Sequence, residues 1–214
     1  MVMAILAVLV AVLLPIFSSS RKSAQKIQVI NDMRNINTSI INYYTDYRRY
    51  PMNERQRAAV ENDGYDTVYG DPGGTYWSAD FFNVLRAVSD DRENQNNILN
   101  PTETVYWQGQ TAQSPTNPVS GITTRDVTRE GNVIHKGSFV DPWGNQYIVW
   151  VDVRTDGDLG TAVGWFYKNT KEGDVRTADP PLGTAFGSMG ADGKFGTKGD
   201  GILKGSDDIV SWLR

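Results

Sequence analysis

Cysteine is absent from this chain of 214 residues, and histidine occurs once, as His135. Without cysteine the protein forms no disulfide and no thiolate metal site, and a Cys–His nucleophilic pair is excluded. One histidine cannot build a histidine metal cluster. The sequence also contains no G-x-S-x-G elbow, P-loop or dinucleotide-binding fingerprint. We therefore expect a protein that is not an enzyme, with His135 in a structural or exposed position.

Positive charge is also scarce. The formal net charge is −4, and no basic block follows Arg21 and Lys22, so the chain has no electrostatic footprint for nucleic acid. Scattered carboxylates could pair for glycoside hydrolysis, but sequence spacing gives no evidence that any two of them face one cleft. The six tryptophans could line a sugar-binding face, although such residues more often fill cores and subunit contacts.

The N-terminus is a long apolar run. Met1 to Phe17 carry no polar side chain, and Arg21 and Lys22 follow them. A signal peptide would instead begin with basic residues and end at a small-residue cleavage site, so we expect the segment to be kept. At ~1.5 Å per residue it covers ~25 Å, slightly less than the ~30 Å hydrocarbon layer of a bilayer. The run predicts a single-pass helix in the inner membrane.

A helical pattern continues beyond the apolar run. From Ile27 to Tyr47, apolar residues recur in steps of three or four, which is the period of an amphipathic helix. Pro51 disfavours helical geometry at Tyr50 and so ends the pattern. The sequence predicts one nearly continuous helix from Met1 to about Arg49. The helix is apolar all round in its first third and striped afterwards. We expect its first part, 1–25, to protrude and its second part, 26–50, to dock on a domain.

The remainder, 26–214, is long enough for one domain with its own core. Within a variable region, 51–135, we expect a short helix at Glu54–Glu61 and a helix capped by Ser78 that runs to about Ser89. Thr102–Trp107 is a candidate strand, and 108–121 reads as an exposed loop.

Strands are expected mainly in 136–189. The segment QYIVWVDV, 146–153, is rich in β-branched and aromatic residues and follows the turn sequence DPWGN, 141–145. Thr161–Tyr167 alternates and predicts the second strand of a hairpin, and a last short strand spans Thr184–Met189. The fold class is therefore α+β: a long N-terminal helix packed on a small antiparallel sheet, with a loop-rich C-terminal region, 190–214.

Several of these segments resemble one family. The stretch MVMAILAVLVAVLLPIF is similar to the N-terminal helix of type IV pilin-like proteins, and Pro15 matches the proline of that helix. DPWGN before an aromatic and β-branched strand resembles the major pseudopilin of type II secretion systems. The resemblance implies a pilin-like fold. It also implies that the family's cleavage-site glycine, N-terminal phenylalanine and glutamate would precede Met1.

The glycine-rich, acidic tail from Gly187 to Arg214 suggests a metal loop. Calcium takes six to eight oxygen ligands from carboxylates and carbonyls on a flexible chain, and the aspartate spacing of an EF-hand is absent. The tail resembles the calcium loop of major pseudopilins. The resemblance implies calcium ligation by Asp192, Asp208, Asp207 and the carbonyl of Met189, with Asp200 a much weaker candidate. The alternative is a solvated acidic turn without an ion.

The resemblance implies a structural subunit that assembles through its N-terminal helix into a helical homopolymer, most like the major pseudopilin of type II secretion. Its partners would be further copies, the inner membrane before assembly, and minor pseudopilins with the secretion machinery. The assembled filament would be periplasmic or extracellular. A major pilin of a surface-displayed type IV pilus-like filament is the alternative, and a membrane-anchored carbohydrate-binding module or hydrolase is a third reading.

Overall fold

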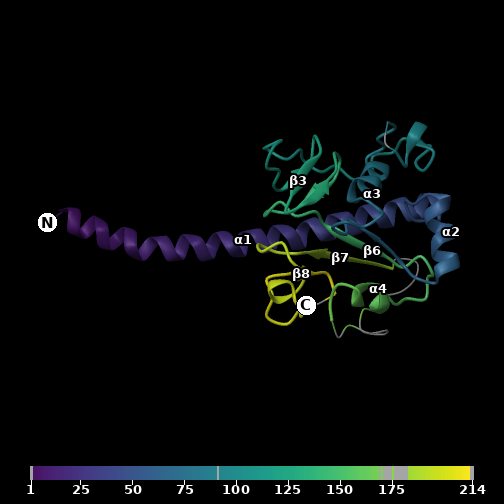
Figure 1. The fold of residues 1–214 in the computed structure, drawn as a ribbon. Coiled ribbons are helices and arrows are strands. Elements are labelled where there is room, and N and C mark those ends of the chain that lie inside the picture. The colour runs from purple at the N-terminus through teal and green to yellow at the C-terminus, as the bar shows by residue number, and fades with distance from the viewer. Residues whose placement is uncertain (1, 91, 169, 171–174, 176–182, 213–214) are drawn as a thin grey trace.

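The long N-terminal helix α1, Val2–Tyr47, organises the fold (Figure 1). The structure, a computed structural model, describes residues 2–90, 92–168, 170, 175 and 183–212; within α1 it describes the side chains of Phe17 and of residues 19–47. At ~1.5 Å per residue the helix is ~69 Å long. Its N-terminal part projects from the domain and its C-terminal part lies along the sheet. The predicted long helix and the α+β class are confirmed.

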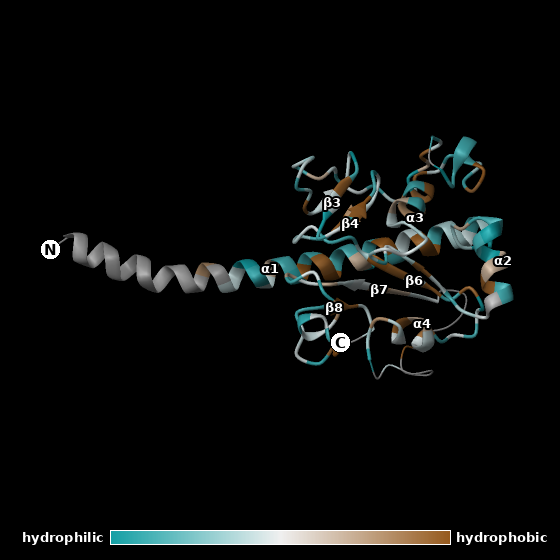
Figure 2. Cartoon of the chain, viewed as in Figure 1, coloured by the Kyte–Doolittle hydropathy of each residue, from teal (hydrophilic) through white to brown (hydrophobic). Residues whose placement is uncertain are grey.

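The docked part of α1 presents a narrow apolar stripe. From Met33 onward its buried side chains follow the predicted stripe, but at its start Val29 is buried while the predicted Ile27 and Ile30 are exposed; the full buried set is Val29, Met33, Ile36, Ile40 and Tyr43. Figure 2 shows hydrophobic residues gathered on this part of α1 and on the strand β6, Ile148–Val151. After Tyr47, Arg48 adopts a positive φ of 53° and Pro51 follows, which ends the helix.

The prediction of a single-pass inner-membrane helix is wrong. Among the described residues, no helix combines the length and the apolarity needed to cross a membrane. The physical reason is visible in the sequence, because the apolar run ends at Phe17 and three serines, Arg21 and Lys22 follow within the same helix. The run alone covers ~25 Å, short of the ~30 Å hydrocarbon layer.

The central sheet has four antiparallel strands in the order β1-β6-β7-β8. Beside β6 lie β1, Thr67–Tyr69, and β7, Thr184–Ser188, and β8, Ile209–Val210, forms the edge next to β7. Both faces of β6 are buried. Val149 and Val151 join the core beneath α1, while Ile148 and Trp150 join a second core on the opposite face. This burial explains why β6 shows no polar alternation.

Smaller elements surround this sheet. Helix α2, Glu54–Asp63, begins at a capping box formed by Asn53 and Gln56, and α3, Ser78–Leu85, is buried along its whole length. Two short antiparallel pairs and two 3-10 turns lie outside the central sheet: β2, Gly121–Ile122, with β5, Phe139–Val140; β3, Val127–Arg129, with β4, Asn132–Ile134; η1, Gln95–Asn97; and η2, Thr197–Gly199.

Three local predictions need correction. Thr161–Tyr167 is not a strand, because helix α4, Gly160–Gly164, occupies its first half and buries Ala162 and Val163 in the second core. Trp77, rather than Ser78, holds the N-cap position of α3, where its N–H donates to the Asp80 carboxylate. Thr102–Trp107 forms no strand and runs as irregular chain.

Candidate functional site

The loop 189–208 joins the neighbouring strands β7 and β8, which fixes where its ends lie. Gly187 pairs with Val210 and Ser188 with Ile209. This register brings Asp192, near the start of the loop, to Asp207 and Asp208, at its end. One carboxylate oxygen from each of the three lies within 4.8 Å of the others. The structure thus brings together the three carboxylates that the sequence singles out.

Backbone N–H groups hold these carboxylates in place. Asp207 Oδ2 accepts from Ala191 N–H at 2.5 Å and from Asp192 N–H at 3.2 Å. Asp192 Oδ1 accepts from Lys194 N–H at 2.9 Å, and Asp208 Oδ2 accepts from the N–H of Gly196 at 2.7 Å. Each aspartate is therefore oriented by the loop itself, with its remaining oxygen left for another partner.

Gly190 is required for this arrangement. Its φ is +65°, and a Cβ added there would lie 2.6 Å from the Asp207 carbonyl oxygen and 2.7 Å from Asp207 Cγ. The close approach of the two loop ends therefore depends on a residue without a side chain. Met189, the predicted carbonyl ligand, is buried immediately before it.

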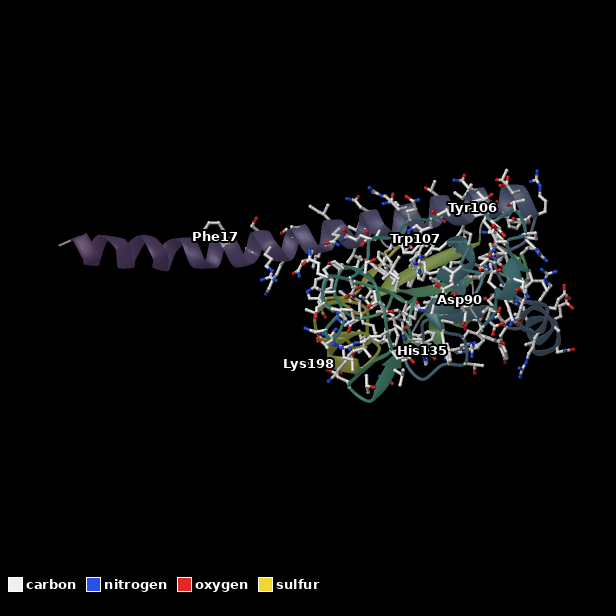
Figure 3. The ribbon with its side chains drawn as sticks, turned by 90° about the horizontal axis from the view of Figure 1, so that it is seen from above. Phe17, Asp90, Tyr106, Trp107, His135 and Lys198 are labelled. Atoms are coloured by element: carbon white, nitrogen blue, oxygen red, sulfur yellow. The ribbon has the colours of Figure 1, made fainter. Side chains whose placement is uncertain are left out.

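The charges of the cluster are uncompensated within the part of the chain that the structure describes. No lysine or arginine forms an ion pair with Asp192, Asp207 or Asp208. Of the loop lysines, Lys198 lies at the edge of the domain (Figure 3). Three carboxylates this close repel one another unless protons or a cation intervene.

Asp208 is the most constrained member. Burial raises its pKa to about 6, the hydrogen bond from Gly196 lowers it, and the charges of Asp207 and Asp192 raise it. Its Oδ1 atom is buried and makes no hydrogen bond of normal geometry to any described residue, although the Tyr167 hydroxyl lies beside the carboxylate. The Tyr167 hydroxyl is the neighbour that lowers the pKa of Asp208 by hydrogen bonding. Asp200 stands apart from this group, and its Oδ1 accepts from Ile202 N–H.

The turn DPWGN supports the loop, a role that sequence reasoning missed. Asn145 donates from Nδ2 to the carbonyl oxygen of Gly190 at 2.7 Å. Asp141 is fully buried and accepts from Ser188 Oγ at 2.6 Å and from the N–H groups of Trp143 and Asn145. The turn therefore fixes the point at which the loop leaves β7. The separation of these residues in the chain concealed the link.

A second acidic group, also missed, has a different character. Asp66, Asp152 and Asp156 offer oxygens within 4.8 Å of one another. Arg154 forms ion pairs with Asp66 and Asp156, and backbone N–H groups bond to Asp66 and Asp152. The negative charge of this second acidic group is thus partly neutralised by Arg154, unlike that of the three carboxylates in the loop 189–208.

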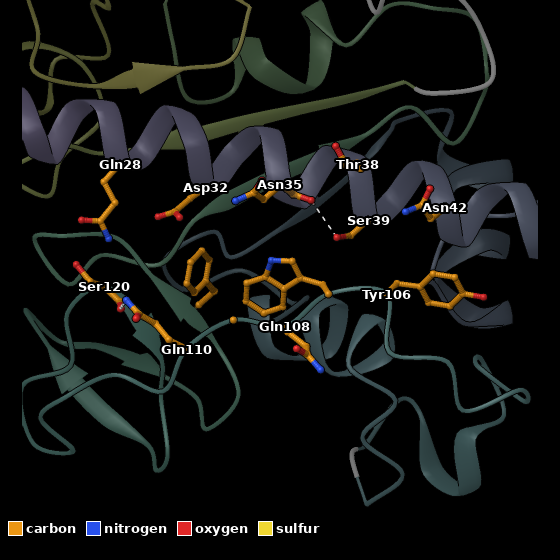
Figure 4. A pocket seen from close by; sticks show the side chains of 13 residues that line it. Gln28, Asp32, Asn35, Thr38, Ser39, Asn42, Tyr106, Gln108, Gln110 and Ser120 are labelled. Atoms are coloured by element: carbon orange, nitrogen blue, oxygen red, sulfur yellow. Dashed lines mark hydrogen bonds between the residues drawn. The ribbon is translucent and has the colours of Figure 1, made fainter.

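A polar groove of about 500 Å³ runs beside α1 (Figure 4). Gln28, Asp32 and Asn35 line it from the helix, and Gln108 and Gln110 belong to the opposite wall. Asp32 is the only charged group among its described lining residues, and Tyr147 donates to it at 2.8 Å. Burial raises the pKa of Asp32, and this hydrogen bond lowers it. The groove offers mainly neutral donors and acceptors.

The lone histidine and most tryptophans have structural positions. His135 stacks on Trp77 with ring centroids 3.4 Å apart, and Arg92 lies 3.7 Å from the centre of the same indole. Trp107 and Trp150 are buried in the two cores, and Trp143 and Trp212 pack against them. Of the six tryptophans, only Trp165 is exposed.

No protein-family model, curated protein or solved structure matches the chain. Any function proposed for the site must therefore be argued from the geometry of its own residues.

Proposed function

We propose that this protein is a structural subunit of a helical filament with a pilin-like fold, most similar in role to the major pseudopilin of type II secretion systems. The observation that carries the proposal is the division of α1. One part packs on the sheet through its apolar stripe, while the other projects from the domain and has an apolar sequence from Met1 to Phe17. An apolar surface of this size requires a partner.

Exposed apolar side chains at the end of the run and after it support the same conclusion. Phe17 and Ile27 are 65% and 59% exposed on the helix, and Ile30 is also exposed. Further copies of the chain carry the same helix. Packing these helices against one another would bury the apolar surface of each copy in the same way. A contact of this head-to-tail kind that does not close into a ring extends into a filament. Minor pseudopilins and the secretion machinery would be the remaining partners.

Two matched substitutions test the assembly. Ile27→Asp places a charge on the projecting side of α1 and should abolish filaments seen by electron microscopy. Ile98→Asp makes the same change at an equally exposed site on the domain, 68% exposed, and should leave filaments intact. Both variants should retain the wild-type melting temperature of the domain. Normal filaments from Ile27→Asp would contradict the proposal.

We propose further that the loop 189–208 binds calcium through Asp192, Asp207 and Asp208, with the Met189 carbonyl as an additional ligand. Two observations support this fit: the three carboxylates converge, and no described basic side chain forms an ion pair with them. Hard oxygen ligands on a glycine-rich chain suit calcium better than magnesium, which demands a tighter octahedral shell. The ion would fasten the tail to the sheet.

Thermal unfolding with calcium and with chelator tests this site. Ion binding to the folded chain alone adds RT ln(1 + [L]/Kd), ~2.7 kcal/mol at a hundredfold excess over Kd. Asp192→Asn should remove this calcium-dependent increase in melting temperature, whereas Asp200→Asn, in the same loop but outside the cluster, should retain it. If the wild type has the same melting temperature in calcium and in chelator, the loop is an acidic turn that binds no calcium. The filament would then resemble a surface pilus as closely as a pseudopilus.

A further inference from the structure

A second cavity, of about 220 Å³, lies on another part of the domain. It is enclosed by the end of α2, strand β1, the turn 70–76 and the residues that follow α4. Four aromatic side chains line it: Tyr65, Tyr76, Trp165 and Phe166. Two carboxylates, Asp66 and Asp71, share this lining. The combination of aromatic rings and carboxylates is independent of the filament contact and of the loop 189–208.

Tyr76 and Phe166 pack against the two cores, whereas Tyr65 and Trp165 form an exposed aromatic pair at the cavity. Trp165 is 56% exposed and Tyr65 is 49% exposed, and their rings meet edge to face with centroids 5.3 Å apart. Tyr65 and Trp165 come from segments a hundred positions apart in the chain. A large aromatic pair held in this exposed position offers ring faces and edges to a ligand.

The carboxylate of Asp71 is the second feature of the cavity. This carboxylate lines the cavity and makes no hydrogen bond or ion pair with any residue of the described ranges. Burial raises the pKa of Asp71. Asp66 differs, because Arg154 and the N–H groups of Val153 and Arg154 already bond to it. The uncompensated negative charge in the cavity is therefore that of Asp71.

We propose that this cavity binds an organic ammonium group, held by the ring faces of Trp165 and its neighbours and by the carboxylate of Asp71. No described lysine or arginine lines the cavity. Aromatic faces carry negative potential, and cages of such rings recognise quaternary and methylated ammonium groups. Rings and carboxylate thus attract the same sign of charge. The ammonium belongs either to a free amine or to a lysine side chain of another protein.

Choline and its neutral carbon isostere, 3,3-dimethylbutan-1-ol, provide a matched pair of probes. Binding is followed by the NMR signal of the Trp165 indole N–H in the full chain, assigned by its loss in Trp165→Phe. Choline should shift this signal in a saturable way, and the isostere should bind about tenfold more weakly because it lacks the charge. Equal binding of the two probes, or saturation by glucose without any effect of choline, would overturn the proposal.

Variants of the carboxylate separate charge from shape. Asp71→Asn should weaken choline binding about tenfold, while Asp90→Asn, at an exposed site, should not change it. Gly74→Ala keeps the charge but places a methyl 2.9 Å from Asp71 Oδ2, so it should also weaken binding by displacing the carboxylate. Unchanged binding in both Asp71→Asn and Gly74→Ala would refute the role of Asp71. A trimethyllysine peptide that binds more tightly than choline would identify a protein side chain as the source, and the reverse a free amine.

Discussion

Asp141, in the turn that supports the candidate metal loop, gives the sharpest test of the buried electrostatics. Its side chain is fully buried, and three hydrogen bonds reach it, from Ser188 Oγ and from the N–H groups of Trp143 and Asn145. Burial raises its pKa to about 6, and these hydrogen bonds lower it. Asp141→Asn keeps the shape and both backbone bonds but removes the charge.

The sign of the pH effect follows from these contacts. The folded chain holds the Asp141 proton more tightly than the unfolded chain, whose carboxyl has the ordinary pKa of 3.8. The free energy of unfolding should therefore fall as pH rises from about 4 to about 6. A pKa of about 6 against 3.8 corresponds to at most about 3 kcal/mol for this group. Asp141→Asn lacks this loss, so it should be slightly less stable than wild type at pH 4 and about 2 kcal/mol more stable at pH 7.

Urea unfolding followed by tryptophan fluorescence, at pH 4 and pH 7 with chelator present, measures the difference. Asp66 and Asp208 also have pKa values raised to about 6, but both remain in the variant, so the comparison with wild type isolates Asp141. Asp141→Ala serves as the control, because it loses all three hydrogen bonds and should be about 2–4 kcal/mol less stable than Asp141→Asn at either pH. A difference between wild type and Asp141→Asn that is the same at both pH values would refute this reasoning.

Two further substitutions probe the loop and the docking of α1. Gly190→Ala should destabilise the chain about 1–3 kcal/mol more than Gly64→Ala, since both glycines have positive φ but a Cβ clashes with Asp207 only at Gly190. Equal melting temperatures of these variants would show that the clash is relieved without cost. Tyr147→Phe removes the hydroxyl that donates to Asp32 and should cost about 1–2 kcal/mol in urea unfolding. It should also raise the pKa of Asp32 further in an NMR titration, and an unchanged pKa would contradict the contact.

The elements that could be predicted from sequence have strong local signals. Helix α1 has a sustained helical period, α2 a side-chain cap from Asn53, and β6 a run of β-branched and aromatic residues. The strand predicted at 161–167 was wrong because alternation and helical spacing coincide over so few residues. Val163 and Tyr167 fit either pattern. Strands β1 and β8 span three and two residues, and pairing with distant segments defines them.

The candidate site divides in the same way. Its three aspartates could be named from the tail alone, through residue type, glycine content and family resemblance. Their support could not, since the contact of Asn145 with Gly190 depends on the placement of β7 beside β6. The pairing of Thr67 with Val151 likewise puts Asp66 opposite Asp152, which no local pattern reveals. That calcium binds stays a prediction.

The edge of the sheet at β8 is the part of the fold that an ion in the loop would govern. β8 pairs with β7 through two residue pairs, whereas β6 and β7 share four, so β8 is held by the fewest contacts of this kind. Without a cation, repulsion among the three carboxylates opposes the pairing that closes the loop. With one, the same charges draw the loop ends together. Because Val210 and Trp212 pack in the second core, this closure is also what seals the face of the sheet opposite α1.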